Sequence, residues 1–203
     1  MLTVACVKVG NKYGNEYVTN LKAGVERHLT VPHEFVCITD APIDGIKCIE
    51  APDNLPGWWC KLFLFKLRKP LLYFDLDVVI TGDLTRAIEW EGFGIIKDWW
   101  LPGFNSSVMR LTGNEDLWDK FDPNARAKYY MGDQHFISEM MPDAETFPPE
   151  WFPSYKANRC QDGPPNDAMA VIFHGEPKPS QLGGWVREKW CQRTSSDRLK
   201  ATA

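Results

Sequence analysis

Apolar residues occur along the chain in two patterns, short continuous runs and a repeat at every fourth position. The two patterns alternate, which predicts strands interleaved with helices. Short, predominantly apolar runs predict strands that are buried on both faces of a sheet. These runs cover residues 2–9, 35–38, 46–49, 71–74, 93–96, 107–111 and 168–173. Between residues 17 and 29, by contrast, an apolar residue recurs at every fourth position, which predicts an amphipathic helix that ends before Pro32.

Helical spacing is also present in several shorter segments that separate the predicted strands. These segments cover residues 58–67, 115–121, 134–140 and 185–191. Residues 142–167 are rich in Pro, Asp and Asn, which predicts an irregular loop beside the active site. Because strands and helices alternate, we expect an α/β fold with a mainly parallel central sheet flanked by helices.

Length and composition are typical of one globular domain. The chain has 203 residues, of which 44% are hydrophobic and 25% are charged. We expect the domain to cover residues 1–193 and the polar tail at residues 194–203 to be disordered. No apolar run is long enough for a membrane span, and the net charge of −4 gives no support to a nucleic-acid-binding surface.

The cysteines and the N-terminus together predict a cytoplasmic protein. The six cysteines include no C-x-x-C pair, and Cys6 and Cys37 lie inside apolar runs, where a thiol packs as a small hydrophobic side chain. Reduced thiols are typical of the cytoplasm. The first residues also lack the long apolar stretch of a signal peptide, because Lys8 interrupts the run.

Two carboxylates directly follow a fully apolar strand. Asp75 and Asp77 come after residues 71–74, and if the backbone stays extended, its period of two places both carboxylates on one face. Adjacent anionic groups repel each other unless a cation or hydrogen-bond donors compensate them. Carboxylate oxygens suit Mg²⁺ or Mn²⁺, and open α/β sheets bind ligands at the carboxyl ends of their strands. The simpler alternative is a pair of solvated turn carboxylates.

Five segments of the chain form an ordered set of motifs within roughly residues 1–180. The segments are Trp59-Cys60-Lys61-Leu62, the stretch 71–84 that contains Asp75-Leu76-Asp77, Asn105-Ser106-Ser107-Val108-Met109, Gly132-Asp133-Gln134 and His174-Gly175-Glu176-Pro177-Lys178-Pro179. In this order they resemble the motifs of GT-A-fold glycosyltransferases, especially glycosyltransferase family 8 and its relatives. The chain departs from the family pattern where Lys61 replaces an Arg, where Ser107 replaces a Gly, and in the shortened last segment.

The resemblance implies a metal and phosphate site. Asp75, Asp77 and His174 would hold Mn²⁺ or Mg²⁺ between the two phosphates of a nucleotide sugar, a UDP-sugar by the family default. Lys178 would contact the distal phosphate, and Gly175, which follows His174, would also belong to the donor-binding residues. For His174 and Lys178 the alternatives are a structural histidine and a solvated surface lysine.

The same resemblance implies contacts to the rest of the donor. Val7 and Lys8, at the end of the first strand, would contact the base or ribose, Lys61 would contact the diphosphate or the donor sugar, and Asn105 would contact sugar hydroxyls. The alternatives are a surface charge for Lys61 and a turn residue for Asn105.

A further pair, Asp133 and Gln134, would lie beside the anomeric carbon, where the carbonyl oxygen of Gln134 would support the developing oxocarbenium charge. Asp133 also suits the N-cap position of a helix.

We therefore expect a metal-dependent enzyme that transfers a hexose with retention to an acceptor that the sequence leaves open. A glycan, a lipid-linked sugar, a protein and a modified DNA base are all compatible. An inverting enzyme would need a carboxylate base, for which Asp98, Asp133 and Asp162 are candidates. The alternatives are a phosphatase of the haloacid-dehalogenase type with Asp75 as its nucleophile, and a non-catalytic module that binds a nucleotide sugar.

Overall fold

The residues that the computed structural model describes, 2–191, form a twisted sheet in the order β3-β2-β1-β4-β7-β6-β8. Its strands are β1 (Leu2–Lys8), β2 (His33–Thr39), β3 (Lys47–Glu50), β4 (Leu71–Phe74), β6 (Gly94–Lys97), β7 (Phe104–Leu111) and β8 (Glu145–Thr146). The first four strands in the order are parallel, whereas β7 is antiparallel to both of its neighbours. The predicted α/β fold with a mainly parallel sheet is confirmed; the tail at 194–203 lies outside the described residues.

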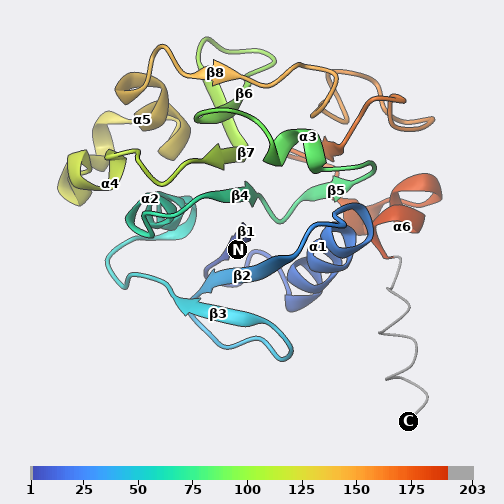
Figure 1. Cartoon of the computed structure of the whole chain (residues 1–203), viewed down its shortest axis with the longest axis horizontal. Helices are drawn as coiled ribbons and strands as arrows, with labels where there is room; N and C mark the ends of the chain where they lie inside the picture. The colour runs from blue at the N-terminus through green and yellow to red at the C-terminus, as the bar shows by residue number, and fades with distance from the viewer. Residues whose placement is uncertain (1, 192–203) are drawn as a thin grey trace.

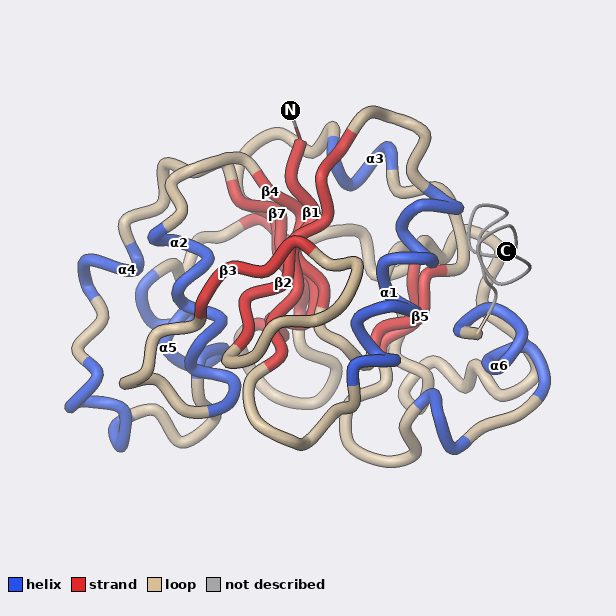
Figure 2. Tube along the Cα trace, turned by 90° about the horizontal axis from the view of Figure 1, so that it is seen from below, coloured by secondary structure: helices blue, strands red, loops and turns tan. Residues whose placement is uncertain are grey.

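Helices cover both faces of this sheet (Figures 1 and 2). One face carries α2 (Phe63–Lys66), α4 (Leu117–Lys120) and α5 (Asp133–Met140), and the other carries α1 (Asn15–His28) and α6 (Gly184–Trp190). Each face has its own hydrophobic cluster. The sheet is therefore the middle layer of three, as expected when crossover helices connect parallel strands.

The packing of β4 on both of its faces explains why its sequence is continuously apolar. Leu72 and Phe74 pack into the cluster on the α1 face, while Leu71 and Tyr73 pack into the cluster on the α2 face. All four side chains are buried because alternate residues of a strand point to opposite faces and both faces are covered. Asp75, directly after this buried strand, is the first residue whose side chain is partly exposed to solvent.

A small second sheet brings two distant parts of the chain together. β5 (Val78–Ile80) pairs antiparallel with β9 (Ala170–Ile172), and the amide of Phe173 donates to the carbonyl of Asp77 at 3.1 Å. The late apolar run at 168–173 was predicted as a strand, but its partner was not. This pairing carries His174 to the side of Asp77.

Several elements differ from the sequence-based expectation. The helix predicted at 58–67 is a 3₁₀ helix, η1 (Gly57–Leu62), continued by the single turn of α2, and the predicted loop at 142–167 contributes edge strand β8. The short helices α3 (Thr85–Ile88), η2 (Pro123–Lys128) and η3 (Pro179–Gln181) were not predicted. Within residues 2–191, no helix has the length and apolar character needed to cross a membrane.

Strand β4 is the structural support of the Asp75 segment, which gives a stability prediction. Leu72 is fully buried, whereas Leu101 is 49% exposed. Leu72→Ala should lower the free energy of unfolding by about 2–5 kcal/mol because it leaves a cavity between β4 and the α1 face. The matched change Leu101→Ala should cost less than about 0.5 kcal/mol. Urea unfolding measures both, and equal losses would contradict the placement of β4 at the centre of the core.

Candidate active site

One pocket of about 370 Å³ opens at the carboxyl ends of β1 and β4. Eleven residues that the resemblance selected for the site line this pocket, from segments up to 171 positions apart (Lys178 against Val7), whereas two of the candidate bases, Asp98 and Asp162, do not line it. The eleven are Val7, Lys8, Lys61, Asp75, Asp77, Asn105, Asp133, Gln134, His174, Gly175 and Lys178. The structure brings the residues together; their individual roles stay predictions.

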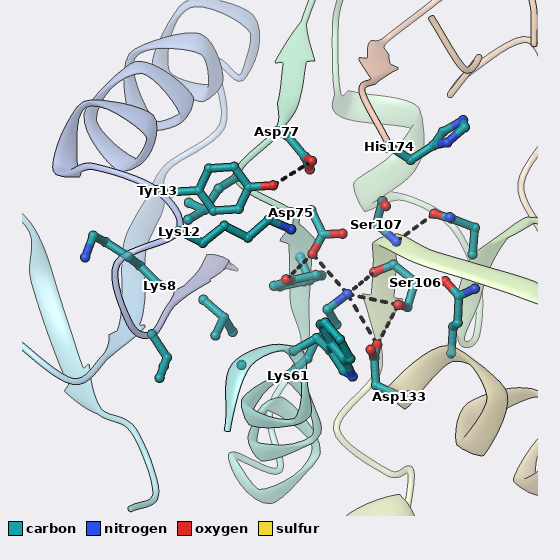
Figure 3. A pocket seen from close by; sticks show the side chains of 18 of the residues that line it. Lys8, Lys12, Tyr13, Lys61, Asp75, Asp77, Ser106, Ser107, Asp133 and His174 are labelled. Atoms are coloured by element: carbon teal, nitrogen blue, oxygen red, sulfur yellow. Dashed lines mark hydrogen bonds and ion pairs between the residues drawn. The ribbon is translucent and has the colours of Figure 1, made fainter. Parts of the chain in front are cut away.

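Lys61 is the centre of a buried charge cluster (Figure 3). Its Nζ lies 3.0 Å from Asp75 Oδ1, 3.3 Å from Asp133 Oδ2 and 2.9 Å from Ser106 Oγ. The hydroxyl of Ser106 donates to Asp133 Oδ2 at 2.6 Å, and that of Tyr73 donates to Asp75 Oδ1 at 2.6 Å. The cluster joins η1, the end of β4, the start of β7 and the first turn of α5.

The electrostatics of the cluster keep Lys61 charged. Burial acts to lower the pKa of the Lys61 ammonium, but the carboxylates of Asp133 and Asp75 outweigh it, so the pKa is raised. Burial likewise acts to raise the pKa of Asp75, and Lys61 overcomes it, so that this pKa is lowered. For Asp133, burial prevails over Lys61 and the pKa is raised. An ammonium group has three N–H donors, and those of Lys61 are directed at protein oxygens. Lys61 therefore holds the two carboxylates in place.

Asp77 has a separate set of partners on the other side of the pocket. The hydroxyl of Tyr13 donates to Asp77 Oδ2 at 2.8 Å, and Lys178 forms an ion pair with the same oxygen. The Lys178 ammonium also donates to the carbonyl of Phe173 at 3.2 Å. Burial, followed by the charge of Asp77, raises the pKa of Tyr13 far above its ordinary range, so Tyr13 remains a hydrogen-bond donor.

His174 lines the pocket but is held by its own neighbours. Its Nε2 lies 2.7 Å from Ser154 Oγ, its ring stacks on Trp99 with centroids 5.1 Å apart, and the edge of Trp100 meets it at 4.5 Å. Burial, with the nearby charge of Lys156, lowers the pKa of the imidazole, which favours the neutral form. Gly175, next in the chain, has φ of +68°, a conformation that glycine adopts without strain.

Local hydrogen bonds hold the side chains of Asp133 and Asn105. Gly132 occupies the N-cap position of α5, and the carboxylate of Asp133 accepts from Ser106, so the alternative that Asp133 is the N-cap is wrong. Asn105 Oδ1 accepts from the amide of Ser107 at 3.0 Å, and Asn105 lies in β7, so the alternative that it is a turn residue is wrong. Lys8 extends away from Asp75 and Asp77 (Figure 3).

Comparison with known proteins identifies this architecture. No protein-family model matches the sequence, and no curated protein matches it. Solved structures do match. GlyE, a glycosyltransferase of Streptococcus pneumoniae TIGR4, superimposes with a TM-score of 0.74 at 15% identity over 99% of this chain and 63% of GlyE. LgtC, a galactosyltransferase solved with donor and acceptor sugar analogues, gives a TM-score of 0.65 at 13% identity over 98% of this chain and 94% of LgtC.

A third match is the bifunctional glycosyltransferase WbbM, with a TM-score of 0.73 at 10% identity over 98% of this chain and 51% of WbbM. This chain has the GT-A glycosyltransferase fold. At such identities the likeness establishes the GT-A fold and not an activity. The chain spans less than two thirds of the length of GlyE and about half that of WbbM.

The residues expected to hold a metal ion in this GT-A fold fit one by chemical type. The carboxylates of Asp75 and Asp77 and the imidazole of His174 are ligands that suit Mn²⁺, and all three line the same pocket. They are not assembled as a ready site, because no group of three such ligands converges within residues 2–191. Lys178 pairs with Asp77 Oδ2 and Ser154 contacts His174 Nε2, so both contacts would compete with a metal ion for those atoms.

The sequence missed three of the polar residues that surround the site. Tyr13 and Lys12 line the pocket from the loop after β1, and Ser106 joins the Lys61 cluster from β7. For Tyr13 the available signal was its place a few residues beyond the carboxyl end of the first strand, where GT-A and other α/β folds bind ligands. For Ser106 the available signal was its place in the motif that begins at Asn105, although nothing in that motif gave it a role.

Removing the Lys61 charge tests the cluster directly. Lys61→Met leaves the buried carboxylate of Asp133 and the partly buried carboxylate of Asp75 without their cation, and should lower the free energy of unfolding at pH 7 by about 3–5 kcal/mol. Without Lys61 the pKa of both carboxyls rises above its unfolded value. The penalty is therefore complete above the raised pKa values and disappears below about pH 4.

The control is Lys69→Met, which removes a half-exposed lysine that pairs with Glu34 at 3.2 Å and should cost about 1 kcal/mol or less. Urea unfolding between pH 3 and pH 7 measures both variants. A Lys61→Met penalty that is small, or that does not depend on pH, would show that the carboxylates are not held by this charge.

Proposed function

We propose that this chain is a metal-dependent glycosyltransferase that transfers a hexose from a nucleotide-diphosphate sugar, with UDP as the favoured nucleotide. The observation that carries the proposal is the gathering of five separate sequence motifs around one pocket of a GT-A fold. Charged groups of both signs line it, as a diphosphate and its counter-ion require.

Each wall of the pocket has a role in this proposal. Asp75, Asp77 and His174 would hold Mn²⁺ or Mg²⁺, which neutralises the charge of the departing diphosphate when it is bound. Lys178, released from Asp77, would pair with the distal phosphate. Asp133 and Gln134 lie beside the Lys61 cluster and would face the sugar, with Asp133 accepting hydrogen bonds from its hydroxyls.

Transfer with retention follows if the acceptor approaches on the face that the diphosphate leaves. The bond between the anomeric carbon and the diphosphate oxygen breaks, the acceptor oxygen bonds to the same face of that carbon, and the acceptor proton passes to the departing phosphate oxygen. Gln134 would orient its carbonyl oxygen toward the positive charge that develops on the sugar ring. No carboxylate base is needed in this route.

The proposed setting is the cytoplasm, which the free state of all six cysteines supports. The phosphatase alternative would use the same Asp75, of which Lys61 and Tyr73 engage only Oδ1. A binding module without turnover remains the competing proposal, and turnover separates the two.

Release of UDP from UDP-glucose and UDP-galactose in the presence of Mn²⁺ is the test of the function. We expect turnover that disappears when EDTA is added and that falls by at least about a hundredfold in Asp75→Asn and Asp77→Asn, because each loses an anionic ligand. Binding of UDP without turnover would favour the module. Phosphate release from simple phosphomonoesters would instead support the phosphatase and contradict the transferase.

The role of Lys178 is tested by the affinity for UDP. Lys178→Met should raise the dissociation constant roughly tenfold or more, because an ammonium–phosphate contact is lost. Lys47→Met is the matched control, since Lys47 also pairs with a carboxylate, that of Glu34, but lies outside the pocket. Isothermal titration calorimetry measures both, and equal affinities in the two variants would remove Lys178 from the phosphate site.

A further inference from the structure

Four lysines and three aspartates line the candidate active site. Lys61 and Lys178 are paired with the aspartates, and Lys8 donates a hydrogen bond to a backbone carbonyl at 3.4 Å. The side chain of Lys12, by contrast, forms no ion pair and no hydrogen bond within residues 2–191, and its ammonium lies 5.1 Å from the centroid of the Tyr13 ring. The charge of Lys12 is thus available to a ligand.

The Tyr13 ring beside Lys12 is held in a fixed position. Its hydroxyl donates to Asp77 Oδ2 at 2.8 Å, and its ring packs against that of Tyr17, a buried residue of α1, with centroids 4.7 Å apart. The ammonium of Lys178 also lies near this ring, 5.6 Å from its centroid. An aromatic ring attracts a cation at such distances. Two ammonium groups are therefore held beside one ring in the pocket.

Lys12 points into the pocket. It belongs to the loop between β1 and α1, and its side chain extends toward Asp75, whereas that of Lys8 extends in the opposite direction (Figure 3). An ammonium group has three N–H donors and no acceptor, so its ligand must supply oxygens that accept hydrogen bonds. Anionic oxygens make the stronger contact, because charge-assisted hydrogen bonds are stronger than neutral ones.

We propose that Lys12 is a phosphate-binding residue, and that Lys12 and Lys178 together hold the diphosphate of the donor. This inference rests on the proposed function, which gives a phosphate contact to Lys178 and no role to Lys12. The two ammonium groups come from distant parts of the chain, yet both lie beside the Tyr13 ring. A diphosphate has anionic oxygens on both of its phosphorus atoms, so each lysine can pair with a different phosphate.

Charge balance favours a phosphate as the partner of Lys12 over a neutral part of the nucleotide. The base and the ribose present neutral carbonyl and hydroxyl groups, which a neutral donor can satisfy equally well. Lys61 stays with its two carboxylates and Lys8 points away from the pocket centre. Of the lysines that line the pocket, Lys12 and Lys178 are therefore the two that can neutralise a diphosphate.

Isothermal titration calorimetry with UDP in the presence of Mn²⁺ tests whether the charge of Lys12 is what binds. Lys12→Met should raise the dissociation constant roughly five- to tenfold, because one ammonium–phosphate contact is lost. Lys12→Arg keeps the charge and should stay within about threefold of the unchanged protein. Lys12→Gln keeps hydrogen-bond donors without the charge, and should lose as much affinity as Lys12→Met.

The matched control is Lys66→Met. Lys66 is exposed, as Lys12 is, and its ammonium also lies over aromatic rings, those of Phe63 and Trp118, but it does not line the pocket. Its replacement should leave the affinity for UDP within about twofold of that of the unchanged protein.

The results for Lys12 and for the proposed function can be told apart. If the unchanged protein does not bind UDP, the proposed function fails and the role of Lys12 fails with it. If UDP binds and Lys12→Met has the same affinity as Lys66→Met, the Lys12 proposal alone is overturned. It is also overturned if Lys12→Gln binds UDP as tightly as the unchanged protein, since a neutral contact to the base or ribose would then account for the residue.

Discussion

The buried ammonium of Lys61 is the interaction on which the site depends. Two carboxylates, Asp75 and Asp133, lie within 3.3 Å of it, in a setting where either charge alone would be costly. They come from the end of β4 and from the start of α5, so one cation fixes the position of two walls of the pocket. Ser106 adds a third wall through its hydroxyl, which donates to Asp133. Lys61, on a short 3₁₀ helix, thus offsets the repulsion between the two carboxylates and fixes their positions.

A second constraint comes from backbone pairing. The β5–β9 ladder places the segment after β9 beside Asp77, so that Lys178 reaches an aspartate 101 positions earlier in the chain. The two aspartates of the Asp75-Leu76-Asp77 segment therefore have different lysine partners, one deeply buried and one at the pocket wall. In the proposed mechanism Lys61 stays in place and Lys178 exchanges between Asp77 and a phosphate.

The fold class was predictable from the pattern of apolar residues, whereas most members of the candidate site were indicated by the resemblance of five ordered motifs to those of GT-A glycosyltransferases. Continuous apolar runs such as residues 71–74 occur only when both faces of a strand are covered, and polar residues that end such runs meet at one edge of the sheet. Long-range partners were not predictable. Nothing in Val78-Val79-Ile80 specifies that it pairs with residues 170–172, and nothing in Ser106 or Ser154 indicates a contact to Asp133 or His174. Such contacts depend on tertiary packing, which periodicity does not encode.

The central claim is that Asp75 and Asp77 are ligands of one metal ion that a nucleotide diphosphate helps to hold. Anomalous diffraction at the manganese absorption edge, from crystals grown with Mn²⁺ and UDP, tests it most directly. The account predicts one anomalous peak between the two carboxylates, with His174 turned from Ser154 to become the third protein ligand and Lys178 moved from Asp77 to a phosphate. UDP bound in the pocket with no peak there, or a peak at another group of residues, would contradict it.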